Sequence, residues 1–279
     1  MFTASRVLLC VTLFSLTVPV VAQQMPILSK ACPVGTKEAQ ALFQTGMLIR
    51  SGKGSEKKNP QLAEEYFEMA IVKGSAQAAI ALGDMYRYDF AKKHPKAVRE
   101  KQSKAMYTLA TELGCPDASA FLAEYHNKGM GVKKDPEKAL ELVKQAADAD
   151  SPKGMEVYGR LIAEYKKDVD SGRIWLKRAI EMGNGDAGLP LADTYAREKD
   201  IGGVVVSLRS GAAQGSRQCL QVLTAIFADG RYGQNKDAMH ASCYRKLEKS
   251  IDEYAAPQPI ANLEKLCAMK KFFMPFRNR

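Results

Sequence analysis

The stretch FLAEYHNKGMGVKKDPEKALELVKQAADADSPKG, residues 121–154, decides the fold because it contains one complete helical hairpin. Apolar residues at helical spacing lead to Gly129 and Gly131, where glycine can take the left-handed conformation that closes a helix. Asp135 and Pro136 then match an N-cap followed by proline at the first helical position. Small and apolar residues at helical spacing follow again. The stretch therefore predicts two antiparallel helices joined by a loop.

The same unit recurs along the chain. In five places a turn residue is followed eight positions later by a large apolar residue, while the step between units shrinks from 40 to 36, 33 and 32 residues. The pairs are Gly74 and Leu82, Gly114 and Leu122, Asp150 and Tyr158, Gly183 and Leu191, and Gly215 and Leu223. A spacing that stays constant while the rest varies indicates one repeated unit. We therefore expect an all-α fold, a right-handed α-solenoid of about five to six stacked helix-turn-helix hairpins.

Small residues occupy fixed places in these units, where they allow two helices to approach closely. Four positions after the turn residues stand Ala78, Ala118, Gly154, Ala187 and Cys219. Glycine inside a helix costs about 1 kcal/mol relative to alanine. Gly83 and Gly159, nine positions after their turn residues, therefore predict close backbone contacts that offset this cost.

At these positions the chain resembles the Sel-one-like repeat family, a relative of the tetratricopeptide repeats. The resemblance covers residues 36–254. It rests on ALGDMY at 81–86, GMGVKKD at 129–135, KAL at 138–140, and Ala146 with Ala147. Exported members of this family in Gram-negative bacteria include immunity proteins, which block toxic lipases or other envelope-directed effectors of type VI secretion. The resemblance implies a similar role here, by occlusion of a protein partner.

Two further hypotheses remain open. The protein could be a periplasmic adaptor or assembly factor for envelope proteins. It could also be an enzyme with a hydrolytic site of unfamiliar pattern, although the sequence offers no nucleophile with an adjacent base. The three histidines, His94, His126 and His240, have no partner at metal-ligand spacing. We therefore expect no enzymatic activity, no catalytic residues, no cofactor and no metal.

The unit lengths vary only between the first and second helix of each hairpin, and in a stack these connections lie along one edge. Insertions along one edge often mark a binding side, and arginine and tyrosine are favoured anchors in protein interfaces. The candidate partner-binding residues are Arg87, Tyr88, Phe90, Lys92, Lys93, Lys128, Met130, Arg231 and Tyr232.

The N-terminus has the pattern of a secretory signal peptide. Arg6 precedes an apolar run that is too short to span a bilayer comfortably, and small residues end at Ala22. We expect residues 1–22 to be removed after Ala22, which places the protein in the periplasm. Residues 23–35 have little helical periodicity and are expected to be extended.

The chain is basic, with 41 Lys and Arg against 31 Asp and Glu, a net charge of +10. Loss of Arg6 with the signal peptide leaves +9. This charge favours an acidic partner, such as an acidic secreted effector, although solvated lysines on repeat helices would give the same balance. Export and the lack of a nucleic-acid motif argue against nucleic acid as a partner.

Five cysteines remain after the predicted cleavage, so at least one thiol stays free. An exported chain meets an oxidising compartment, and a possible disulfide joins Cys243 and Cys267. Residues 255–279 are expected to form a capping helix, from Ile260 to about Met269, followed by a basic aromatic tail. This tail is the one segment for which membrane contact is considered.

Overall fold

The computed structural model describes residues 32–53, 57–90, 94–231, 234–251 and 258–268. Within these ranges the regular structure is helical. The α-helices are α1 (Lys37–Ser51), α2 (Pro60–Val72), α3 (Ala76–Asp84), α4 (Lys96–Glu112), α5 (Pro116–Lys128), α6 (Pro136–Asp148), α7 (Pro152–Leu161), α8 (Val169–Glu181), α9 (Gly188–Arg197), α10 (Ile201–Ala213), α11 (Arg217–Asp229), α12 (Ala238–Ser250) and α13 (Leu263–Ala268). The π-helical turns η1 (Met85–Asp89) and η2 (Ile162–Lys166) extend α3 and α7, and the 3-10 turn η3 (Gly185–Ala187) precedes α9.

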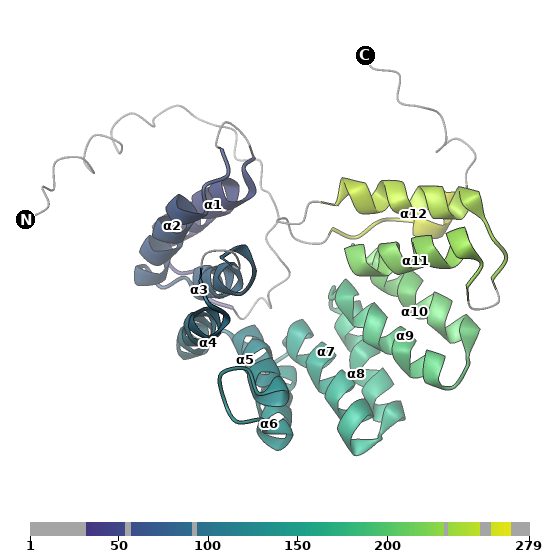
Figure 1. Cartoon of the computed structure of the whole chain (residues 1–279), viewed down its shortest axis with the longest axis horizontal. Coiled ribbons are helices and arrows are strands. Elements are labelled where there is room, and N and C mark those ends of the chain that lie inside the picture. The colour runs from purple at the N-terminus through teal and green to yellow at the C-terminus, as the bar shows by residue number, and fades with distance from the viewer. Residues whose placement is uncertain (1–31, 54–56, 91–93, 232–233, 252–257, 269–279) are drawn as a thin grey trace, which may run out of the picture.

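Helices α1 to α12 pair in order into six antiparallel hairpins that stack into an open ring (Figure 1). The predicted α-solenoid is confirmed, and the described part of the chain contains six hairpins. First helices of successive hairpins approach one another, because α5 contacts α7, α7 contacts α9 and α9 contacts α11. The first helices therefore form the inner, more closely spaced layer of the curve, and the second helices form the outer layer.

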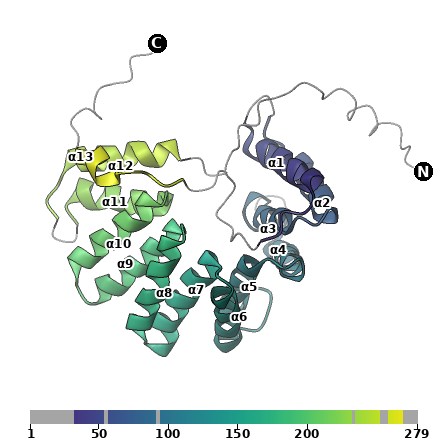
Figure 2. The ribbon, with the colours of Figure 1, turned by 180° about the vertical axis from the view of Figure 1, so that it is seen from behind.

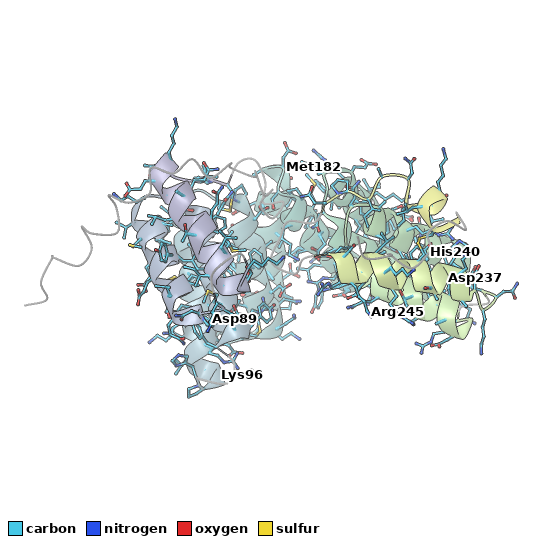
Figure 3. All side chains as sticks on the ribbon, turned by 90° about the horizontal axis from the view of Figure 1, so that it is seen from above. Asp89, Lys96, Met182, Asp237, His240 and Arg245 are labelled. Atoms are coloured by element: carbon cyan, nitrogen blue, oxygen red, sulfur yellow. A yellow bond between two sulfur atoms is a disulfide. The ribbon has the colours of Figure 1, made fainter. Side chains whose placement is uncertain are left out.

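Two kinds of connection alternate along the stack. We call the connections within hairpins the hairpin loops, and those between hairpins, centred on Gly74, Gly114, Asp150, Gly183 and Gly215, the fixed turns. Figure 3 shows Met182, beside one fixed turn, on the opposite side of the molecule from Asp89 and Lys96, which flank a hairpin loop. Every fixed turn has its central residue at positive φ, between 55° and 94°. The predicted turn residues therefore mark real chain reversals, each with its central residue at positive φ.

Five of the six hairpin loops end at a side-chain N-cap, as the sequence predicts for Asp135, and the loop before α4 ends at Pro95 without one. The side-chain oxygens of Asn59, Asp135, Asp168 and Asp200 each accept a hydrogen bond from a backbone N–H three residues later. Asp237 accepts from the backbone N–H groups of Met239 and His240. These bonds satisfy donors that have no partner inside the helix, so the five second helices other than α4 each begin at a capped residue.

The seams between helices depend on small residues. A Cβ atom added at Gly83 would lie 2.7 Å from the Tyr107 ring, and one at Gly159 would lie 2.8 Å from the backbone oxygen of Gly172. The predicted backbone contact is confirmed at Gly159, whereas the close neighbour of Gly83 is a side-chain ring. At Gly154 an added Cβ would lie 2.6 Å from the Cβ of Ala146. Helices are therefore packed closely both within hairpins and, at Gly154, between them, with no room for a further methyl group.

Both ends of the described chain are fixed by disulfides. The predicted bond between Cys243 and Cys267 is present and joins α12 to α13. A second bond, between Cys32 and Cys115, was not predicted from the sequence. Cys219 keeps a buried free thiol, whose pKa burial raises to about 12. In Figure 2, which shows the molecule from behind, α13 lies beside α12 at the last hairpin.

Several domain assignments fall wholly or partly outside the described residues. The signal peptide at 1–22 and the basic aromatic tail lie outside them. Residues 32–35, the described part of the segment expected to be extended, are not helical. The C-terminal helix is shorter than the predicted Ile260–Met269 and spans Leu263–Ala268. None of the helices in the described ranges is both long and apolar enough to cross a membrane.

Candidate interaction surface

Arg87 and Tyr88, two of the predicted partner-binding residues, lie in the π-helical turn η1 at the end of the first helix of the second hairpin. Such turns interrupt the regular hydrogen bonding of an α-helix and are frequent at functional sites. The wider turn changes the direction of the side chains that follow α3. Arg87 is largely covered, whereas Tyr88 is 59% exposed.

Arg87 connects the second hairpin to the third. Its guanidinium donates to Glu124 Oε2 of α5 at 2.9 Å, and Lys128 lies 3.6 Å from the same oxygen. Arg99 of α4 donates to the backbone oxygen of Arg87 at 2.8 Å, which holds η1 in place. The predicted residues Arg87 and Lys128 therefore meet at one carboxylate.

The charged contacts continue to the fourth hairpin. Lys153 of α7 forms an ion pair with Glu156 at 2.7 Å, and Asn184 donates to Glu156 at 3.2 Å. Burial by itself would raise the pKa of the Glu124 carboxyl, but Lys153, Arg87 and Lys128 together lower it. Charges on three hairpins thus act on one another along the inner layer.

Asp84 and Tyr107 support this arrangement from below the surface. The Tyr107 hydroxyl donates to Asp84 Oδ1 at 2.7 Å, and its ring stacks on Phe121 of α5 at 4.8 Å between centroids. Burial raises the pKa of the Asp84 carboxyl, and the hydrogen bond from Tyr107 partly opposes this effect. Since Tyr107 belongs to α4, it joins the first helices of the second and third hairpins.

We call these six charged residues of the inner layer the inner network: Asp84, Arg87, Glu124, Lys128, Lys153 and Glu156. It contains three acidic and three basic side chains, so it has no net charge. Tyr88 stands beside it with the Arg87 guanidinium 5.2 Å from its ring centroid. Burial raises the pKa of the Tyr88 phenol. The nearby charge of Arg87 lowers this pKa, and those of Asp84 and Glu124 raise it. The network therefore holds an aromatic side chain next to a neutral polar surface.

Many exposed basic residues lie elsewhere, in the hairpin loops. Exposed basic residues occur in five of these loops, or at the helix end that enters them: Lys53, Lys57, Lys58, Lys133, Lys134, Lys166, Lys167, Lys199, Arg231 and Lys236. Lysine is depleted in the cores of protein interfaces, whereas arginine and tyrosine are enriched there. Arg87 and Tyr88 are therefore of the types enriched in contact surfaces, whereas the lysines and acidic residues of the inner network are of depleted types. The loops have the composition of a solvated rim.

The remaining predicted residues do not gather at this surface. Phe90 is 2% exposed and packs against Tyr86, so its prediction as a surface contact is wrong. Burial of its apolar ring in the core of the first two hairpins explains the difference. Met130 is half-buried against the core of the third hairpin, and Arg231 pairs with Asp229 in the sixth. Lys92, Lys93 and Tyr232 lie outside the described residues.

Sequence reasoning missed four members of the inner network: Asp84, Glu124, Lys153 and Glu156. A signal was available for Glu124, because Asp84 and Glu124 both stand ten positions after the turn residue of their unit. Side chains at one register of successive first helices face the same layer of the stack. Cys32, Cys115 and Asp117 also lie within 4.8 Å of one another, but both sulfurs form the disulfide and offer no thiolate to a metal.

Comparison with known proteins identifies the repeat. Residues 39–75, 116–151 and 156–184 match the Sel1 repeat family. A search of curated proteins finds no match. Among solved structures, a Sel1 repeat protein from Oxalobacter formigenes is 22% identical, with a TM-score of 0.54 over 77% of this chain and 88% of its own.

Two proteins from Pseudomonas aeruginosa are also similar in structure. Immunity protein Pa5087 is 18% identical, with a TM-score of 0.65 over 84% of this chain and 89% of its own. Immunity protein PA5088 is 16% identical, with a TM-score of 0.58 over 78% and 82%. At these identities the likeness shows a shared fold. The matched ranges are Sel1 repeats, and the six stacked hairpins make the described part of the chain a helical solenoid of the kind that these repeats form.

Proposed function

We propose that this protein is a non-enzymatic immunity protein that acts in the periplasm, where it binds an envelope-directed toxic effector and occludes it. The observation that carries the proposal is the surface around Tyr88. Arg87, held to the third hairpin by its ion pair with Glu124, and the exposed Tyr88 beside it form an anchor of the kind that dominates protein interfaces.

Two further observations support the proposal. Pa5087 and PA5088, which share the fold, are immunity proteins. Two disulfides in a chain with a signal-like N-terminus are typical of proteins in oxidising compartments. The neutral inner network provides the contact with the effector, and the exposed basic residues of the hairpin loops accelerate encounter with an acidic partner.

Protection of cells tests the role and the compartment together. Cells that lack the protein should be harmed by effector-producing siblings, and expression with residues 1–22 should restore survival. Expression without these residues should not restore it. Equal protection by both forms would contradict action in the periplasm. Defective envelope assembly in the absence of any effector would favour the adaptor hypothesis instead.

The anchor is tested with a matched pair of tyrosines. Tyr88→Ala should weaken capture of the effector by about 30-fold or more, the effect of losing an interface hot spot. Tyr165→Ala is the control, because Tyr165 is 43% exposed and lies in the equivalent turn η2, outside the inner network. Both variants should keep the wild-type melting temperature. Equal weakening by the two substitutions would show that Tyr88 is not the anchor.

A further inference from the structure

The segment before α1 forms a strap across two fixed turns. We call residues 32–35 the N-terminal strap. The backbone oxygen of Pro33 accepts a hydrogen bond from Ala76 at 3.1 Å, at the start of α3. Cys32 is disulfide-bonded to Cys115, which directly precedes α5. The strap therefore holds the beginnings of the first helices of the second and third hairpins.

The other ends of the same two helices are joined by the inner network. Arg87, just after α3, pairs with Glu124 near the end of α5. The disulfide and this ion pair thus hold α3 and α5 at opposite ends, with Tyr107 of α4 between them. Removing one of the two connections frees the helices to pivot about the other. The position of Tyr88 therefore depends on a disulfide at the opposite edge of the stack.

The bond is shielded in the folded protein. Cys32 is 4% exposed and Cys115 is 1% exposed. Thiol–disulfide exchange requires a thiolate to reach one of the sulfurs, so this disulfide is closed to exchange while the surrounding hairpins are folded. It behaves as a bond made once during folding, not as a reversible switch.

We propose that the Cys32–Cys115 disulfide is an oxidation-dependent lock that assembles the inner network only after export. This inference rests on the proposed function, since it concerns when the same surface becomes competent to bind. To close the lock, the two thiols transfer two electrons and two protons to a protein disulfide oxidant, whose own disulfide becomes a dithiol. Before this step the chain has no connection between the starts of α3 and α5 through the strap.

Hydrogen exchange measured by mass spectrometry tests the lock without any partner. In Cys32→Ser/Cys115→Ser, amides in 76–89 and 116–128 should exchange at least about 10-fold faster than in the wild type, because local opening becomes easier. Cys243→Ser/Cys267→Ser is the matched control and removes the other disulfide. In the control, faster exchange should be confined to 238–268. Unchanged exchange in 76–89 in the first variant, or equal acceleration there in the control, would overturn the proposal.

A second measurement uses the wild-type chain and stands even if the double serine variant fails to fold. Refolding in dithiothreitol should leave 76–89 and 116–128 unprotected, and reoxidation with oxidised glutathione should restore protection. Full protection of both segments in the reduced chain would overturn the lock. The folded, oxidised protein should also resist alkylation at Cys32 and Cys115 in dithiothreitol, and rapid alkylation with protection retained would equally overturn it. These readouts separate the lock from the proposed function, which the survival of effector-challenged cells tests.

Discussion

The fixed turns and the hairpin loops, on opposite edges of this solenoid, differ in backbone geometry. At the fixed turns, Gly74, Gly114, Gly183 and Gly215 have φ between 83° and 94°. In the hairpin loops, the positive-φ glycines lie between 62° and 72°, and Lys167 and Lys199 occupy equivalent positions at 61°. The second range lies close to the left-handed region that residues other than glycine can reach, and the first lies beyond it.

This difference explains why one edge is constant and the other variable. A turn at φ near 90° selects glycine, so its sequence and length are constrained by backbone geometry. A loop at φ near 60° accepts lysine at a modest energetic cost, so it can change in sequence and length without disturbing the stack. Asp150 is the exception among the fixed turns, and its φ of 55° matches the loop geometry.

The largest expected effect comes from adding volume beside a fixed turn. Gly154→Val should destabilise the protein by about 3 kcal/mol, because its side chain overlaps Ala146 and the backbone of Ala147. Gly202→Val is the matched control, since Gly202 also lies in the first turn of a helix but at the loop edge, where an added Cβ would meet only Asp200 Oδ1, at 3.5 Å. Its effect should stay within about 0.5 kcal/mol. Urea unfolding followed by circular dichroism measures both, and equal costs would remove the distinction between the edges.

A smaller effect is expected from the backbone alone. Gly183→Ala should cost about 2 kcal/mol, because φ at this fixed turn is 94° and strains any residue with a Cβ atom. Lys167→Gly, in a hairpin loop at 61°, should change the free energy of unfolding by less than about 1 kcal/mol. The same urea titration gives both values. A tolerated alanine at position 183 would show that turn geometry does not fix this edge.

Protonation of a helix cap gives a pH-dependent contribution at the loop edge. Hydrogen bonds from Ser171 lower the pKa of the Asp168 carboxyl. Its stabilising effect is therefore complete above the unfolded value of about 3.9 and is lost as the pH falls through the lower folded value. Asp168→Asn keeps a capping oxygen that does not titrate. The urea midpoint of this variant should fall less than that of the wild type between pH 5 and pH 2, and parallel curves would refute the assignment.

The smallest effect is expected from the exposed basic residues of the hairpin loops. Lys133→Gln/Lys134→Gln should alter stability by no more than about 0.5 kcal/mol, because both side chains are exposed. If the rim accelerates encounter, the same double variant should slow association with an acidic partner at low salt and leave dissociation unchanged. Surface plasmon resonance at two salt concentrations separates these rates. A faster dissociation would place these lysines in the contact itself.

Local signals in the sequence were enough for the fold. The turn residues, the caps such as Asp135, and the glycines at positions 83 and 159 each act over a few residues, so their pattern predicts hairpins and close seams. The pairing of Cys243 with Cys267 followed from their proximity in sequence and is confirmed. The pairing of Cys32 with Cys115 spans 83 residues, and no local pattern reports it.

The candidate surface was only partly predictable, because it depends on how the hairpins are stacked. Arg87 and Tyr88 were found from their position near a variable connection. Phe90, two residues further along, was misjudged, since the π-helical turn η1 rotates it into the core. The partners of Arg87 and Lys153 come from the stacking of first helices, which a single repeat does not encode.

The stacking of hairpins on their nearest neighbours has a mechanical consequence. Five junctions lie in series between the first and last hairpins, so small rotations at each junction add along the ring. A small tilt at each junction would change the width of the opening in Figure 1. Each hairpin can therefore stay rigid while the solenoid as a whole bends. A bound partner would then be held by closure of the ring around it as well as by direct contacts.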